Sequence, residues 1–363
     1  MPNGRRRSSW AISDCLLLAF AFSPIAPSPC LSFAMPSAVA AADGPAPLRW
    51  LVVDFDGTCT AEDTTPLLPR MASLHAGDDD GERCARLGAF RALEEEFFRA
   101  HSEVKDALFA GSGGGGSDSL HSALNALDQV STSVTASVSK SACLAGLPKR
   151  PEEVLRILER DGALRSGARL RAGCAEAVAR AHEAGWELGV LSINWCPPLI
   201  EAVLVGAVRR HLREGGERGA LPAPEIWSNS VDEAGAVRLL IPGASAKRSR
   251  IAAIRKSRGR AISEIGAQGG GVKDDPVIVY IGDSSTDLSA LQEADVGIML
   301  GRSSTVVSFA ERWGIRLAGL AERQTGGAAN RGKHQLDARD SNTVWIADDW
   351  SQIDGLLREI GDG

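Results

Sequence analysis

Short runs of consecutive apolar residues alternate along this chain with longer stretches in which apolar residues recur every three or four positions. The runs lie at Leu51–Val53, Glu187–Leu191, Val277–Ile281, Val296–Leu300, Gly314–Leu320 and Val344–Ala347. Such runs are typical of strands buried on both faces, as in a parallel sheet. The alternation predicts an α/β fold, a doubly wound and mostly parallel sheet with helices on both faces and the active site at the carboxyl ends of the strands.

About 130 residues separate the first two predicted strands, far more than a crossover connection needs. Helical periodicity predicts one helix over Arg83–Phe109 and a second through Leu120, Leu124 and Leu127, with the Gly-rich segment 111–117 as a flexible loop. We therefore predict an inserted α-helical cap. The predicted domains are a core formed by 48–63 and 165–361 and a cap at 64–164.

The remaining pattern predicts smaller elements. A helix is expected over Leu199–Leu212, and a hairpin over Glu225–Leu240 with its turn at Glu233-Ala234-Gly235. The segment Ser131–Ser141 is rich in Ser, Val and Thr and has no clear period. No element is assigned to it.

The amino-terminal segment 1–42 has the features of a cleaved targeting leader. Three arginines at 5–7 precede an apolar run at Cys15–Phe22, and Ala38-Val39-Ala40 is a small-residue cleavage pattern. Ser32–Pro36 is similar to the junction of the two-part plastid leaders of algae. The apolar run is too short to span a bilayer. We expect import into a plastid or mitochondrion, with secretion or a plain disordered tail as alternatives, and no membrane contact after leader removal.

Composition fits a globular enzyme: 363 residues, 44% hydrophobic, with a formal net charge of −6. Lys and Arg are dispersed, so no binding face for nucleic acid is predicted. Beyond the leader there is an odd number of cysteines without C-x-x-C spacing, which indicates free thiols. They are Cys59, Cys84, Cys143, Cys174 and Cys196. Cys59 and Cys196 flank the predicted site, where packing is the simpler interpretation.

Two carboxylates, Asp54 and Asp56, follow the first predicted strand two residues apart. Both can serve one site only if the backbone turns at once, as Gly57 permits. One acid can then attack an ester while the other transfers protons. The same pair could instead bind a structural cation or cap the next turn.

Three further segments place polar residues where phosphoryl transfer needs them. The second strand leads into Ser192, Ile193 and Asn194, which offer a hydroxyl and backbone N–H groups. Lys247 begins a helical pattern, although a solvated surface lysine has the same appearance. The segment Gly282–Asp287 places Asp283 and Asp287 where the third strand ends.

Together these segments resemble the four ordered motifs of the haloacid-dehalogenase (HAD) superfamily of phosphohydrolases. The resemblance implies a nucleophile at Asp54, a general acid and base at Asp56, and Mg²⁺ as the cofactor. The metal would be held by the Asp54 side chain, the Asp56 backbone carbonyl and Asp283, and Asp287 would orient Lys247 or a metal-bound water. Contacts to phosphate are expected from Gly57, Thr58, Ser192, Ile193, Asn194 and Lys247.

A narrower resemblance covers Trp50–Leu357 and concerns the phosphatase half of the two-part thiamine-salvage proteins of plants. It rests on segments 54–68, 191–204, 280–300 and 344–353, with Thr-Cys-Thr at 58–60 and Trp195-Cys196 as the distinctive positions. The thiaminase-type half of those proteins is absent from this chain. The implied partner is a small phosphorylated metabolite, thiamine monophosphate, with pyridoxal phosphate, phosphocholine and sugar phosphates as alternatives.

Glu62, Asp63 and Thr64 lie at the hinge into the cap, where their acids could bind a cationic group such as thiazolium. A solvated loop is the alternative interpretation. Trp195 is a further candidate for substrate contact.

Two rival functions remain open. Gly282-Asp283-Ser284 also matches the block that carries the serine of GDSL-type esterases, but His334, after it, has no aspartate three positions before it. An inactive binding protein is the second rival, although it has no need for a cluster of buried like charges. The sequence does not indicate the oligomeric state.

Overall fold

The computed structural model of the chain describes residues 49–111, 117–214, 224–267, 277–321 and 342–361. The predicted leader, 1–42, lies outside these residues.

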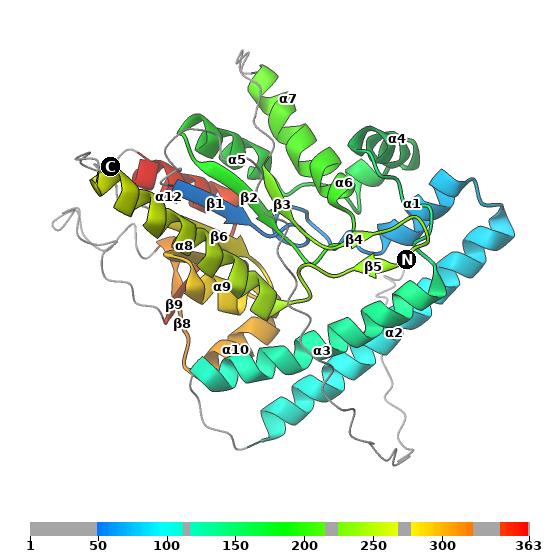
Figure 1. Ribbon diagram of the computed structural model, residues 1–363, viewed down its shortest axis with the longest axis horizontal. Helices are drawn as coiled ribbons and strands as arrows, with labels where there is room; N and C mark the ends of the chain where they lie inside the picture. The colour runs from blue at the N-terminus through cyan, green and yellow to red at the C-terminus, as the bar shows by residue number, and fades with distance from the viewer. Residues whose placement is uncertain (1–48, 112–116, 215–223, 268–276, 322–341, 362–363) are drawn as a thin grey trace, which may run out of the picture. The chain divides into compact units, whose positions relative to one another are not determined.

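Seven strands form one sheet in the order β3-β2-β1-β6-β7-β9-β8 (Figure 1). Every pairing within it is parallel. The predicted α/β class with a mostly parallel sheet is confirmed. The strands are β1 Arg49–Val53, β2 Glu187–Leu191, β3 Glu225–Trp227, β6 Val277–Gly282, β7 Val296–Leu300, β8 Arg316–Gly319 and β9 Thr343–Ala347.

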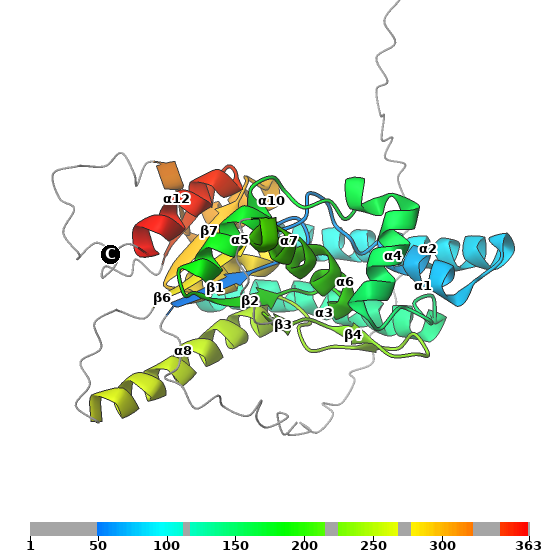
Figure 2. The same cartoon turned by 90° about the horizontal axis from the view of Figure 1, so that it is seen from above.

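Helices cover both faces of this sheet, which explains why β6 and β7 are apolar and buried at every position and why β1 is apolar from Trp50 onward. In β1, Leu51 and Val53 belong to one buried cluster with residues of α5 and α12, whereas Trp50 and Val52 belong to a second cluster with residues of α8, α9 and α10. Figures 1 and 2 show α5, α7 and α12 on one side of the sheet and α8 on the other. These helices are α5 Cys174–Glu183, α7 Gly206–Glu214, α8 Ala244–Ala267, α9 Leu288–Glu293, α10 Ser304–Trp313 and α12 Trp350–Gly361.

The segment between β1 and β2 is helical, as predicted. Its two long helices lie side by side (Figure 1). The first begins at a capping box in which Asp79 and Glu82 each accept from the other's backbone N–H, an arrangement that fixes a helix start. The helices of this segment are α1 Leu67–Ala76, α2 Asp80–Ala110, α3 Ser117–Ser141 and α4 Pro151–Asp161.

The unpatterned segment Ser131–Ser141 is the second half of α3. Its hydroxyls bond back to carbonyls four residues earlier, as Thr135 Oγ1 does to Ser131 O at 2.7 Å and Ser139 Oγ to Thr135 O at 3.0 Å. The helix continues because Val134 and Val138, four residues apart, are both buried in the core, while the hydroxyls between them are satisfied within the helix.

The predicted hairpin over Glu225–Leu240 is only partly correct. Its first residues form β3, which pairs in parallel with β2 at the edge of the main sheet. The hairpin itself is shorter, with β4 Ser230–Val231 antiparallel to β5 Val237–Arg238. Gly235, in its turn, has a φ of +88° and supplies the left-handed conformation the turn requires.

The predicted helix Leu199–Leu212 begins as α6 Pro197–Ile200, widens to a π-helical turn at Glu201–Val205 and continues as α7. All five cysteines between 49 and 361 are free, and all but Cys84 are buried. None of the helices in the described ranges is both long enough and apolar enough to cross a membrane.

Candidate active site

Asp54 is the first residue beyond β1 and lies in the interior, with 4% of its surface exposed. Its backbone N–H donates to the carbonyl of Ile281 at 2.9 Å, which extends the β1–β6 pairing by one residue. The chain then turns at Gly57, whose φ is +75°. A Cβ at Gly57 would lie 2.4 Å from Asp283 Oδ2, so only glycine allows that carboxylate to approach the turn.

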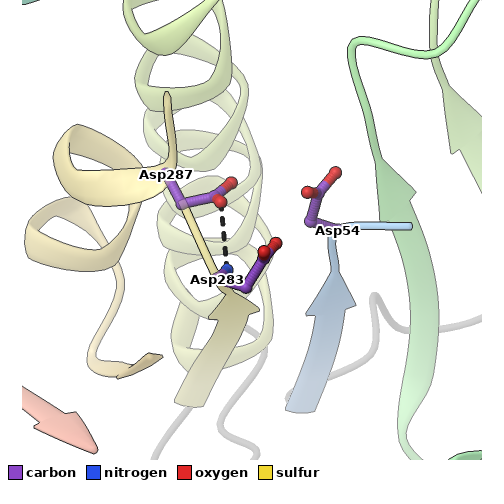
Figure 3. Close-up of side chains that lie close together, drawn as sticks. All are labelled: Asp54, Asp283 and Asp287. Carbon is purple, nitrogen blue, oxygen red and sulfur yellow. Dashed lines mark hydrogen bonds between the residues drawn. The ribbon is translucent and has the colours of Figure 1, made fainter. Parts of the chain in front are cut away.

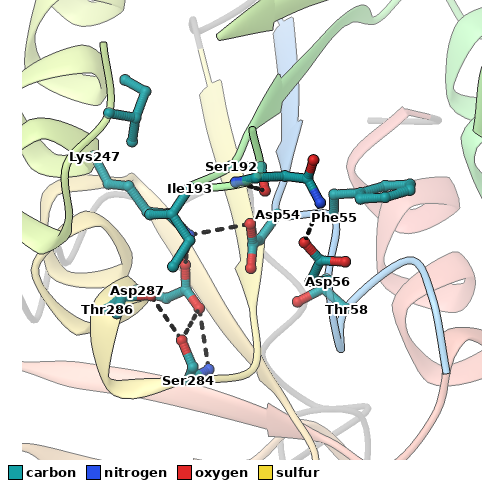
Figure 4. A network of polar contacts seen from close by, with 12 residues as sticks. Asp54, Phe55, Asp56, Thr58, Ser192, Ile193, Lys247, Ser284, Thr286 and Asp287 are labelled. Atoms are coloured by element: carbon teal, nitrogen blue, oxygen red, sulfur yellow. Dashed lines mark hydrogen bonds and ion pairs between the residues drawn. The ribbon is translucent and has the colours of Figure 1, made fainter. Parts of the chain in front are cut away.

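Lys247 is fully buried and bridges two carboxylates (Figure 4). Its Nζ lies 3.0 Å from Asp54 Oδ1 and 2.7 Å from Asp287 Oδ1. Burial acts to lower the pKa of Lys247, but the two carboxylates outweigh it and raise that pKa, so the ammonium stays charged. The helix-start lysine is therefore part of the cluster and not a solvated surface residue.

Asp287 is held by donors on both oxygens. Oδ1 accepts from Lys247 and from the hydroxyl of Tyr280 at 2.6 Å, and Oδ2 accepts from Ser284 N at 3.0 Å and Ser284 Oγ at 2.9 Å. Although burial acts to raise the pKa of Asp287, Lys247 and these hydrogen bonds lower it below its usual value. Asp287 is thus an ionised acceptor that orients Lys247.

Ser284, the serine of the esterase-like block, donates its hydroxyl to the same carboxylate. Because Lys247 and several hydrogen bonds lower the pKa of Asp287, this carboxylate is too weak a base to activate the hydroxyl as an esterase nucleophile. The histidine weighed for that role, His334, lies outside the described residues.

Oxygens of Asp54, Asp283 and Asp287 lie within 4.8 Å of one another (Figure 3). Asp54 Oδ1 is buried and has no well-aligned hydrogen-bond donor among the described residues, although Lys247 lies near it. Burial, with Asp287, raises the pKa of Asp283 to about 6. Burial also raises the pKa of Asp54 well above its usual value, against the opposing effect of Lys247.

These observations fit a hard divalent cation, which prefers oxygen ligands and would offset the repulsion between the acids. Because Asp287 is already saturated with donors, Asp54 and Asp283 are the better ligands. Thr58 donates to Asp283 Oδ1 at 2.9 Å and fixes the rotamer of this acid.

The side chain of Asp56 is held by Thr64, later in the same loop, and by Asn194 of the loop after β2. Oδ1 accepts from Thr64 N at 2.8 Å and Thr64 Oγ1 at 2.6 Å, and Oδ2 accepts from Asn194 Nδ2 at 2.8 Å. Burial, and next Asp63, raises the pKa of Asp56 to about 6, although these hydrogen bonds oppose the shift. An acid with a pKa near neutrality can both give and take a proton.

The loop after β2, which contains Ser192, Ile193 and Asn194, begins at the same sheet edge as Asp54. Figure 4 shows Ser192 and Ile193 near Asp54. Ser192 is fully buried, and its Oγ accepts from Asn194 N at 3.2 Å. The loop is braced by Asn229, which donates to Ile193 O at 2.8 Å and accepts from Ile241 N at 2.7 Å.

The proposed substrate contacts differ in their placement. Thr64 is fully buried and uses its hydroxyl on Asp56, so it holds the acid in place. Glu62 is exposed, whereas Asp63 and Trp195 line a cavity of about 170 Å³ beside the site. Of the three hinge residues, only Asp63 borders this cavity.

Sequence reasoning missed several residues that fix the site. Trp350 Nε1 donates to Thr58 O at 3.0 Å and Arg171 Nε to Gly57 O at 2.8 Å, so two distant segments hold the turn after Asp54. Asp128 of α3 accepts from Ala244 N at 3.0 Å and Ser245 N at 3.2 Å and thereby caps α8, the helix that carries Lys247. Only Trp350 lies in a segment that the motif resemblance had singled out.

No family model matches the sequence. A curated relative, "Bifunctional TH2 protein, mitochondrial" from Arabidopsis thaliana, is 23% identical over 327 residues, which cover 83% of this chain and 48% of the relative. The chain thus spans about half the length of the curated relative it matches. The resemblance to a two-part plant protein, predicted from the motifs, is confirmed by this match.

Two solved structures are also similar. "Phospho-Aspartyl Intermediate Analogue of Phosphoserine phosphatase" is 16% identical with a TM-score of 0.36 and covers 72% of this chain and 90% of its own. A phosphoserine phosphatase from T. onnurineus in complex with NDSB-201 is 14% identical, with a TM-score of 0.36. The match covers 88% of this chain and 98% of that phosphatase chain.

Proposed function

We propose that this chain is a Mg²⁺-dependent phosphomonoesterase that acts through an aspartyl-phosphate on a small phosphorylated metabolite. The observation that carries the proposal is the contact of a fully buried ammonium, Lys247 Nζ, with Asp54 Oδ1 at 3.0 Å. A carboxylate beside a fixed positive charge at a sheet's carboxyl edge can accept a phosphate dianion that would otherwise be repelled.

In the first step an Asp54 oxygen attacks phosphorus and the bond to the ester oxygen breaks, while Asp56 gives its proton to that leaving oxygen. In the second step Asp56 takes a proton from water, the water oxygen attacks phosphorus, and phosphate leaves with Asp54 restored. A pKa of Asp56 of about 6 suits both directions of proton transfer. Ser192, Asn194 and the turn at Gly57 and Thr58 would hold the phosphoryl oxygens.

Asp54, Asp283 and the backbone carbonyl of Asp56 are proposed to hold Mg²⁺. When bound, the ion supplies positive charge that offsets the repulsion between Asp54 and the phosphate. Lys247 supplies a second, permanent charge, which Asp287 keeps oriented.

As substrate we propose thiamine monophosphate. The sequence resemblance to the phosphatase half of thiamine-salvage proteins and the acidic residue Asp63 beside the site support it. Pyridoxal phosphate, phosphocholine and sugar phosphates are the comparison substrates. Residues 64–164 are proposed to act as the cap that encloses the organic part of the substrate.

We further propose that 1–42 is an organellar leader. The name of the Arabidopsis relative, which includes "mitochondrial", supports import. Fluorescence microscopy of the full chain fused to a reporter, compared with a chain that starts at Asp43, tests this; reporter signal in the secretory pathway would contradict it.

The decisive experiment measures p-nitrophenyl phosphate hydrolysis with Mg²⁺ and with EDTA. We expect metal-dependent turnover in the wild type and at least a thousandfold loss in Asp54→Asn, the scale on which loss of a covalent nucleophile acts. The second measurement compares kcat/KM across the four substrate classes. Full activity of Asp54→Asn would contradict the nucleophile, and a flat substrate profile would contradict thiamine monophosphate.

A further inference from the structure

A cavity of about 170 Å³ lies between α2, α3 and the loop that follows β2. It touches the catalytic loops at two places. Ile193 stands between Ser192 and Asn194, and Asp63 precedes Thr64, which binds Asp56. The organic group of an ester bound at Asp54 therefore has this cavity beside it.

Aromatic and aliphatic side chains form much of the cavity wall. Phe90 of α2 and Trp195 of the loop after β2 meet edge to face, with ring centroids 6.5 Å apart. Phe97, also on the wall, lies farther along α2. Three large apolar side chains of the wall are unusually exposed: Phe98 at 61%, Ile193 at 37% and Leu239 at 36%. Apolar surface left open beside catalytic loops indicates a place for a ligand.

The charged side chains on the cavity wall are all acidic. It contains two carboxylates, Asp63 and Glu94, and the described residues that line the cavity include no Lys, Arg or His. Glu94, on α2, is half-buried and makes no ion pair or hydrogen bond with any described residue. Burial, and next Asp63, raises its pKa, although Arg91 opposes the shift. Arg91 does not line the cavity, so the charged side chains on its wall are both acidic.

We infer that this cavity is the subsite for the organic group of the substrate and that it takes a planar cation, with Glu94 and Asp63 as its counter-charges and Phe90 and Trp195 as its aromatic wall. The inference rests on the proposed phosphatase function. A cationic ring gains both from the carboxylates and from the faces or edges of the aromatic rings.

Other leaving groups fit this wall less well. A carboxylate or a second phosphate would lie against two acids with no positive partner among the described lining residues. A sugar could bond to polar side chains of the wall such as Thr65 and Ser131, but it would leave other hydroxyls against Phe90, Leu93 and Phe97, which offer no hydrogen bonds. The cavity therefore discriminates by charge as well as by shape.

The test compares two esters on matched variants. Glu94→Gln should lower kcat/KM for thiamine monophosphate, whose ring is cationic, about tenfold, and should lower kcat/KM for p-nitrophenyl phosphate, whose ring carries no positive charge, by a clearly smaller factor. Glu94→Lys should widen the difference between the two esters. Glu96→Gln is the matched control, because Glu96 lies on the same helix, is exposed and does not line the cavity.

Binding supplies a readout that does not need turnover. Calorimetric titration of thiamine into the Asp54→Asn protein should give a dissociation constant about tenfold weaker when Glu94→Gln is added, and an unchanged one when Glu96→Gln is added. Equal loss for both esters, or unchanged thiamine binding, would overturn the cation subsite. Failure of the wild type to hydrolyse p-nitrophenyl phosphate would overturn the phosphatase proposal instead, and the thiamine titration would still decide the subsite.

Discussion

The carboxylate of Asp128, in α3, accepts the backbone N–H of Ala244 at 3.0 Å and so caps the helix on which Lys247 stands three residues later. The approach is so close that a Cβ on Gly243 would lie 1.9 Å from Asp128 Oδ1. One inserted helix thus fixes the position of the buried ammonium beside Asp54.

We expect Asp128→Ala to lower the free energy of unfolding by about 1 kcal/mol, the usual cost of a lost cap. It should also lower kcat for p-nitrophenyl phosphate more than it changes KM, because Lys247 loses its fixed position. Urea unfolding and steady-state kinetics measure the two effects. Asp106→Ala, at an exposed aspartate of α2, is the control; an unchanged kcat in Asp128→Ala would show that the cap is structural only.

Gly57→Ala should be more harmful than an alanine at another left-handed glycine. Gly57 has a φ of +75° and faces Asp283, whereas Gly185 has a φ of +79° and would place a Cβ with nothing within 4 Å. Both changes carry backbone strain of about 1 kcal/mol. Only Gly57→Ala must also displace Asp283, so it alone should lose at least tenfold in kcat. Similar kinetics for the two variants would contradict this placement.

The buried charges of Lys247 and Asp287 should be strongly coupled in stability. Lys247→Met leaves the carboxylates of Asp54 and Asp287 without their cation, and we expect a loss of about 3–5 kcal/mol. Adding Asp287→Asn removes one orphaned charge, so the double variant should lose less than the sum of the single ones, by about 1–3 kcal/mol.

Urea unfolding of the wild type, Lys247→Met, Asp287→Asn and the double variant measures this coupling. Lys256→Met, at an exposed lysine of the same helix, should change stability by less than about 0.5 kcal/mol. Additive losses would mean that the two buried charges do not interact in the folded protein.

Mg²⁺ should stabilise the folded chain, because the site proposed for it lies where Asp54 and Asp283 repel each other. At a concentration one hundred times its dissociation constant a ligand of the native state adds about 2.7 kcal/mol. Differential scanning fluorimetry with Mg²⁺ or EDTA should therefore show a rise in melting temperature that Asp283→Asn abolishes. Asp348→Asn, at an exposed acid just beyond β9, should keep the full rise; an equal rise in both variants would place the metal elsewhere.

The sheet and the central residues of the site could be predicted because their signals are local. Buried parallel strands need apolar side chains on both faces, and β1, β2 and β6 accordingly appear as apolar runs. The polar residues that follow these runs meet at one sheet edge because parallel strands share the direction of their carboxyl ends. Asp54, Asp56 and Asp283 can therefore be placed at this edge from the sequence pattern alone.

The residues that hold the catalytic loops in place, and the residue proposed to select the substrate, could not be predicted in the same way. Asp128 caps a helix 116 positions later, and Trp350 binds a carbonyl 292 positions earlier, so no spacing in the sequence indicates either contact. Glu94 sits in a long helix among Glu95 and Glu96, and only packing shows which of the three faces the cavity. The sequence pattern predicts a hairpin where β3 lies, because a strand of three residues is too short to indicate a parallel partner.

The inserted helices are not a detachable module. Leu120, Leu124 and Leu127 of α3 belong to the same buried cluster as Ile251 and Ile254 of α8. Excising 64–164 would remove the apolar side chains that cover α8 and also Asp128, which caps the start of that helix. The remaining α/β portion should therefore aggregate or unfold. Transplanting this insertion onto another hydrolase to change its selectivity would have to carry the facing surface of α8 with it.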